Sequence, residues 1–85
     1  MSQHHVVVYV SDNCTQCESL LSFIEKKDIS YELKNVSKSH TARQELRQQD
    51  IYGTPVTFID DEIFLGVPKR RLEQKLGIDT YSFFN

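Results

Sequence analysis

The two cysteines of this sequence, Cys14 and Cys17, form a C-x-x-C motif. The motif follows an apolar, β-branched stretch at residues 5–10 and precedes a segment with helical periodicity. This context predicts that Cys14 lies at the start of a helix. Unpaired backbone N–H groups and the helix dipole favour an anion at that position, and for cysteine the anion is the nucleophilic thiolate. The motif therefore indicates thiol–disulfide chemistry.

The spacing of three predicts different tasks for the two thiols. A helix start lowers a cysteine pKa from about 8.5 to roughly 3.5–7.5 in such motifs. Cys17 shares a helical stripe with Leu20, Leu21 and Ile24, so we expect it to be more buried, with a higher pKa. We predict that Cys14 attacks a substrate disulfide and that Cys17 resolves the mixed disulfide, which leaves Cys14 and Cys17 joined.

Two other interpretations of the cysteines are a static thiol pair and half of a zinc site. Zinc needs about four ligands. The sequence has no second cysteine pair, and His4, His5 and His40 lack ligand spacing. Redox chemistry is therefore favoured, and we expect no metal and no cofactor.

The elements that must position the motif follow from periodicity and turn residues. The expected order is β-α-β-α-β-β-α, an α/β chain whose first two strands are parallel and whose later hairpin is antiparallel. The strands are predicted at 5–10, 29–36, 56–59 and 63–65, and the helices at 15–27, from Ser37 or Ser39 to 49, and from Pro68 to Gly77. In the second strand Ile29, Tyr31 and Leu33 alternate with polar residues.

Composition bounds the class of protein. The 85 residues predict a single domain, 1–85, and the net charge of −2 with a pI near 5.8 gives no basic face for nucleic acid. The longest apolar run, 6–10, is too short to span a membrane, and it begins too early to be the core of a signal peptide. We therefore expect a cytoplasmic protein, and in that reducing compartment cysteines are catalytic more often than structural.

Thr54-Pro55 is the second notable feature. By itself, Pro55 starts a strand and removes one backbone donor, and a trans peptide bond is the ordinary state.

Together, these features resemble the glutaredoxins over about residues 5–78. The shared pattern is an apolar strand, the C-x-x-C motif, a Thr-Pro about forty residues later, and a hairpin that ends at Gly66. The resemblance implies the thioredoxin fold, a four-stranded mixed sheet flanked by three helices. Thr15-Gln16 is similar to the Val-Gln or Met-Gln of NrdH-type redoxins, which supply electrons to class Ib ribonucleotide reductase and are reduced by thioredoxin reductase.

The resemblance also implies roles for individual residues. Cys14 is the nucleophile and Cys17 the resolving thiol, while Thr15, Gln16, Thr54 and Pro55 contact the substrate. A cis bond before Pro55 is implied, so that backbone groups of Thr54 pair with an extended peptide. The implied partners are thioredoxin reductase and disulfide-bearing proteins, among them ribonucleotide reductase, and the protein is expected to be a monomer.

Two stretches depart from glutathione-dependent glutaredoxins. Ser11-Asp12-Asn13 stands where they usually carry a basic residue. Residues 66–70, with Lys69 and Arg70, stand where they carry an acidic segment for the glutathione amino group. A cation there repels the ammonium. NrdH-type redoxins typically have Ser-Gly-Phe-Arg-Pro at 66–70. A glutaredoxin that uses glutathione or another low-molecular-weight thiol remains an alternative, as does a metal or iron–sulfur carrier bound through Cys14.

Charged and aromatic residues outside the motif leave alternatives open. Lys69-Arg70-Arg71 is either a solvated helix face or a contact for an acidic partner. Arg43 and Arg47 are interpreted as ordinary surface. Three aromatic residues follow the last helix, and both packing on the domain and disorder fit them: Tyr81, Phe83 and Phe84.

Overall fold

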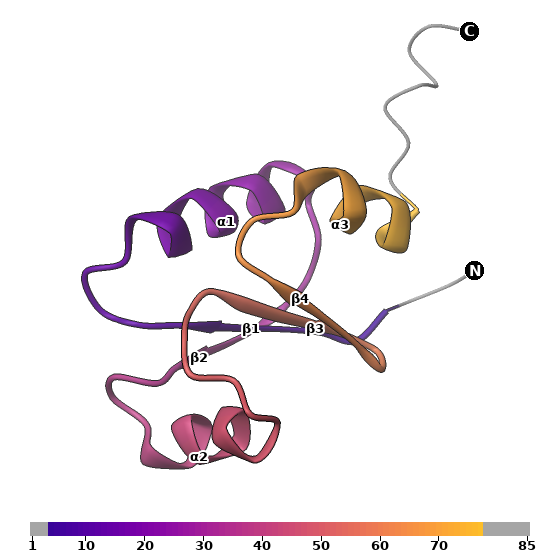
Figure 1. Cartoon of the computed structure of the whole chain (residues 1–85). Helices are drawn as coiled ribbons and strands as arrows, with labels where there is room; N and C mark the ends of the chain where they lie inside the picture. The colour runs from indigo at the N-terminus through magenta and orange to yellow at the C-terminus, as the bar shows by residue number, and fades with distance from the viewer. Residues whose placement is uncertain (1–3, 78–85) are drawn as a thin grey trace, which may run out of the picture.

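The predicted order of elements is confirmed by the computed structural model, which describes residues 4–77 (Figure 1). The elements are β1 (Val6–Val10), α1 (Thr15–Lys26), β2 (Glu32–Asn35), α2 (His40–Gln48), β3 (Val56–Ile59), β4 (Glu62–Leu65) and α3 (Lys69–Leu76). The aromatic residues at 81, 83 and 84 lie outside the described range. No helix within residues 4–77 has the length and apolar character needed to cross a bilayer.

The four strands form one mixed sheet in the order β2-β1-β3-β4. β1 is parallel to β2 and antiparallel to β3, and β3 pairs with β4 as an antiparallel hairpin. α1 and α3 cover one face of the sheet and α2 covers the other (Figure 1). This is the thioredoxin fold expected from the sequence.

The central strand β1 is buried along its whole length, as its continuous apolar sequence predicts. Successive side chains of a strand point to opposite faces of the sheet. Val6, Val8 and Val10 accordingly join the core under α1 and α3, while Val7 and Tyr9 join the core under α2. This strand leads directly into the loop that carries Cys14, so both cores hold the motif in place.

β2 is shorter than the sequence predicts. Ile29 and Tyr31 precede the strand and pack against the α1 side of the core, and Leu33 is 50% exposed. The predicted alternation therefore does not describe the whole segment. The reason is that β2 is an edge strand, with a neighbour on one side only, so less of it is covered.

A hydrogen-bonded group holds α2 against the sheet. The Tyr9 hydroxyl donates to Glu45 Oε1 at 2.7 Å, and Lys34 Nζ donates to the same oxygen at 2.9 Å. Burial, reinforced by the hydrogen bond to Glu45, raises the pKa of Tyr9. The hydrogen bond from Lys34 lowers the pKa of Glu45, so the carboxylate stays ionised at neutral pH. These hydrogen bonds connect β1, β2 and α2 close to the end of β1, from which the chain continues to Cys14.

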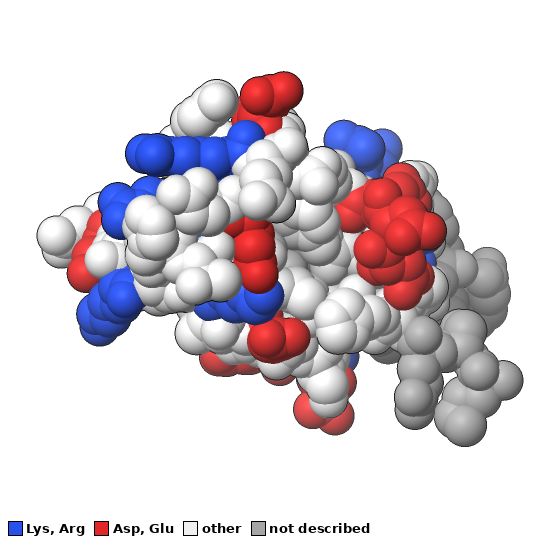
Figure 2. Space-filling view, turned by 90° about the horizontal axis from the view of Figure 1, so that it is seen from below, with Lys and Arg blue, Asp and Glu red and all other residues white. Residues whose placement is uncertain are grey.

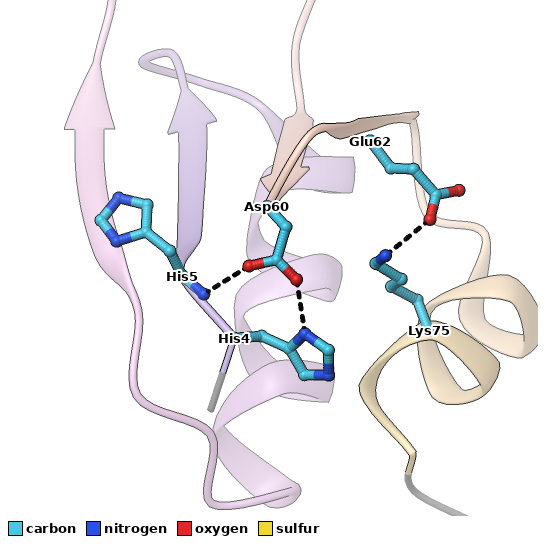
Figure 3. Close-up of polar contacts among 5 residues, drawn as sticks. All are labelled: His4, His5, Asp60, Glu62 and Lys75. Atoms are coloured by element: carbon cyan, nitrogen blue, oxygen red, sulfur yellow. Dashed lines mark hydrogen bonds and ion pairs between the residues drawn. The ribbon is translucent and has the colours of Figure 1, made fainter. Parts of the chain in front are cut away.

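At the opposite end of the sheet, Asp60 fixes the start of β1 to the β3–β4 turn (Figure 3). Its carboxylate accepts from the His5 backbone N–H at 3.1 Å and lies 2.6 Å from His4 Nδ1. The Asp60 backbone N–H donates to the His5 carbonyl at 3.0 Å. Beside it, Lys75 Nζ contacts Glu62 at 2.8 Å and joins α3 to β4.

We expect Asp60→Asn to reduce the loss of stability in acid. The hydrogen bonds from His4 and then from the His5 backbone hold the pKa of Asp60 below its usual value of 3.8. A lowered carboxyl pKa contributes stability that is present above the usual value and is lost as pH falls through the folded-state pKa. Thermal melts between about pH 6 and pH 2.5 will therefore fall more steeply for the wild type than for Asp60→Asn.

Asp61→Asn is the matched control, because Asp61 lies in the same turn and makes no side-chain hydrogen bond within the described residues. Asparagine tolerates the positive φ of 55° at residue 60, so we expect Asp60→Asn to keep the turn. Equal acid profiles for wild type and Asp60→Asn would contradict the prediction.

Candidate active site

Cys14 caps the N-terminus of α1, as the sequence predicts. Its backbone is extended, with φ −121° and ψ 102°, and its Sγ accepts from the Cys17 backbone N–H at 3.1 Å. The sulfur therefore occupies the place of a capping oxygen, at the positive end of the helix dipole. Backbone N–H groups at a helix start in general favour the thiolate form of a cysteine.

Cys14 and Cys17 are joined by a disulfide. Cys14 is half-buried, whereas Cys17 is 3% exposed and belongs to the apolar core with Leu20 and Ile24. The predicted asymmetry of burial is confirmed: Cys14, at the helix start, is less buried than Cys17, which lies one turn deeper. The chemical roles of the two cysteines stay predictions.

The loop before Cys14 is anchored to the β2–α2 connection. The Asp12 backbone N–H donates to Ser37 Oγ at 3.0 Å, and Asn35 Nδ2 donates to Asp12 Oδ1 at 3.1 Å. Asn13 has a positive φ of 55°, a conformation that asparagine adopts more readily than most residues. Of the two serines predicted as possible caps, Ser39 caps α2, since its hydroxyl accepts from the Ala42 N–H at 3.1 Å. Ser37 instead hydrogen-bonds to the loop before Cys14.

The Thr54–Pro55 peptide bond is cis, as the resemblance implies. Pro55 is buried, and the Thr54 hydroxyl lies 2.6 Å from the Ser11 hydroxyl in a hydrogen bond. That bond places Thr54 beside the loop that leads to Cys14. The Thr54 N–H and C=O make no backbone hydrogen bond with the rest of the described chain.

Thr15 and Gln16 are exposed on the first turn of α1. Thr15 lines a hollow of about 430 Å³ that runs along α1 towards Phe23 and Lys69. Among the described residues, no side-chain hydrogen bond connects Thr15 or Gln16 to Thr54, and their contact with substrate stays a prediction.

A second hollow, of about 240 Å³, lies between the motif loop and α2. Ser11 and Thr54 form one side of it, and Arg43 and Arg47 form another. Neither arginine makes an ion pair within residues 4–77, and Tyr52, also in the lining, is 75% exposed. We call this the arginine hollow.

Both arginines are exposed, which agrees with their interpretation as ordinary surface from the sequence. Their spacing indicates a role beyond ordinary surface, because like charges four residues apart in a helix repel each other and destabilise it. Figure 2, seen from the α2 side, shows acidic side chains clustered at one end of the molecule, with basic and acidic side chains mixed over the rest of this face. The β3–β4 turn carries three acidic residues: Asp60, Asp61 and Glu62.

Part of the basic run on α3 covers aromatic rings. Lys69 Nζ lies 5.9 Å from the centre of the Phe23 ring, and the Arg71 guanidinium lies 5.2 Å from that of Phe64. Such contacts stabilise a cation over a ring face. These two residues therefore have a structural role, which agrees with a solvated helix face.

Comparisons with known proteins agree with this geometry. The glutaredoxin family model matches residues 6–64. The thioredoxin-like protein BC3987 is 31% identical, with a TM-score of 0.76 over 81% of this chain and 96% of its own. The NrdH-redoxin of Escherichia coli is 23% identical, with a TM-score of 0.76 over 82% of this chain and 92% of its own. A glutaredoxin from Archaeoglobus fulgidus is 20% identical, with a TM-score of 0.73 over 88% of this chain and 87% of its own. Both share the fold of this chain.

No curated protein matches the sequence. The region matched by the family model nevertheless contains both cysteines and the cis-proline. This chain therefore belongs to the glutaredoxin family, and it is a thiol–disulfide oxidoreductase.

Proposed function

We propose that this protein reduces disulfides in cytoplasmic proteins, that thioredoxin reductase recharges it, and that a class Ib ribonucleotide reductase is one of its substrates. The observation that carries the proposal is the unequal placement of the two sulfurs. Cys14 is accessible and receives an N–H at the start of α1, while Cys17 is enclosed beneath it.

This placement supports a two-step exchange. The Cys14 thiolate attacks one sulfur of the substrate disulfide, and the other substrate sulfur leaves as a thiolate that takes up a proton. Cys17 then loses its proton and attacks Cys14 Sγ, which releases the second substrate thiol. The substrate gains two electrons and two protons, and the Cys14–Cys17 disulfide remains. A reductant returns both electrons.

A protein substrate is supported by the surroundings of Thr54. The hydrogen bond between the Thr54 and Ser11 hydroxyls holds Thr54 beside the motif loop. The Thr54 backbone groups make no backbone hydrogen bond with the described chain. An extended segment that carries a disulfide can add to this edge by main-chain hydrogen bonds. Thr54 also lines the arginine hollow, so this hollow adjoins the edge to which the segment would add.

Thioredoxin reductase as reductant is supported by Thr15-Gln16, which resemble the pair in NrdH-type redoxins. The matched Escherichia coli NrdH-redoxin is described as glutaredoxin-like with a thioredoxin-like activity profile. Glutathione is disfavoured by Lys69 and Arg70, exposed at the start of α3, because cations there repel the glutathione ammonium.

The test is a coupled assay that follows NADPH oxidation with insulin as the disulfide. We expect turnover with thioredoxin reductase, and a rate at least about tenfold lower with glutathione and glutathione reductase, which is a difference of about 1.4 kcal/mol in the barrier. Reactions without this protein measure the background of each reductase. Turnover with the glutathione system alone would overturn the proposed reductant.

A further inference from the structure

The hydroxyl of Thr57 is a buried polar group without a partner. The side chain is 0% exposed, and its Oγ1 makes no hydrogen bond with the described part of the chain. A buried hydroxyl without a partner costs free energy, so native structures rarely retain one without a reason. Valine has nearly the same shape and would carry no such cost.

The register of the sheet places Thr57 in the same core as Cys17. Thr57 is directly opposite Val8 on β1 and Phe64 on β4. Residues opposite each other on neighbouring strands share a face of the sheet. Val8, Phe64 and Cys17 belong to one buried cluster, between the sheet and the helices α1 and α3. Thr57 also lies two positions after Pro55, on the same face of its strand.

Reduction changes what this core must accommodate. In the disulfide, the Cys17 sulfur carries no proton and is only a weak acceptor. Reduction adds two electrons and two protons and makes Cys17 a thiol. During resolution that thiol becomes a thiolate, a charge that needs a donor when it is surrounded by apolar side chains. The Cys17 backbone N–H is already donated to Cys14.

We propose that Thr57 is a positioning residue for Cys17. The Thr57 hydroxyl donates a hydrogen bond to the Cys17 sulfur in the dithiol and mixed-disulfide states. The inference rests on the proposed role of Cys17 as resolving thiol. The hydrogen bond exists only after the disulfide opens, so it stabilises the reduced protein relative to the oxidised one and accelerates resolution.

The test compares Thr57→Val and Thr57→Ser with the wild type. In redox buffers of dithiothreitol, we expect Thr57→Val to shift the equilibrium about tenfold towards the Cys14–Cys17 disulfide, which lowers the reduction potential by about 30 mV. With 5,5′-dithiobis(2-nitrobenzoate), the first thiolate is released by Cys14 and the second by Cys17. We expect only the second release to slow, by about tenfold. Thr57→Ser should retain wild-type values.

Ile59→Val is the control for packing. Ile59 is buried on the same face of β3 as Thr57 and lies two residues farther along the strand from Pro55. It should change neither measurement. The oxidised Thr57→Val protein should melt at or above the wild-type temperature, since it loses an unpaired hydroxyl.

Three results would overturn the inference: unchanged equilibrium and second release in Thr57→Val, equal changes in Thr57→Ser, or equal changes in Ile59→Val. These measurements use no reductase and no protein substrate. They therefore separate a failure of this inference from a failure of the proposed reductant.

Discussion

Cys14→Ser will abolish disulfide exchange, and Cys17→Ser will accumulate mixed disulfides with protein substrates. Cys14 is the accessible sulfur at the start of α1, so its removal leaves no nucleophile. Cys17 is buried one turn deeper, so its removal leaves the attack intact and prevents resolution. Insulin reduction measures the first effect, and non-reducing electrophoresis of the variants measures the second.

The Cys14→Ser, Cys17→Ser double variant is the control for non-specific capture, because it has no thiol. Bands retained by Cys17→Ser, absent from the double variant and released by dithiothreitol are the covalent substrates. Mass spectrometry of those bands tests directly whether a ribonucleotide reductase is among them. The opposite pattern, with mixed disulfides trapped by Cys14→Ser, would reverse the assignment of the two roles.

Reversing the charge of the arginine hollow will slow reduction of acidic protein disulfides. Arg43 and Arg47 line the hollow beside Thr54 and have no carboxylate partner within residues 4–77. Complementary charge accelerates encounter by about tenfold or more at low salt. We therefore expect Arg43→Glu with Arg47→Glu to lower kcat/KM for an acidic protein disulfide by about tenfold. This loss will shrink at high ionic strength.

Lys26→Glu is the charge-matched control for the single variant Arg47→Glu. Lys26 is exposed at the last residue of α1, 12 residues long, and a rise of about 1.5 Å per residue puts it roughly 18 Å along the helix from Cys14. It should have little effect. The small neutral substrate 2-hydroxyethyl disulfide should react equally with all variants. A loss that persists with this substrate would show damage to the motif, and an unchanged kcat/KM with the protein substrate would remove the hollow from the docking surface.

Sequence reasoning succeeded where the signal is local. The helical stripe of α1 and the turn residues around Cys14 predicted which sulfur is accessible and which is buried. Gly77, with a φ of 75°, ends α3 where the sequence places the stop. Each of these features depends on neighbours within about one or two helical turns.

Periodicity and capping act over a few residues, so the sequence was sufficient to predict the order of the elements, the α/β class and the helix-start position of Cys14. Only the folded chain shows that Thr54 contacts Ser11, that Arg43 and Arg47 line a hollow with Ser11, and that the Thr57 hydroxyl is buried without a partner in the described chain. Those relations join residues far apart in the chain, and they exist only after β1 and β3 have paired.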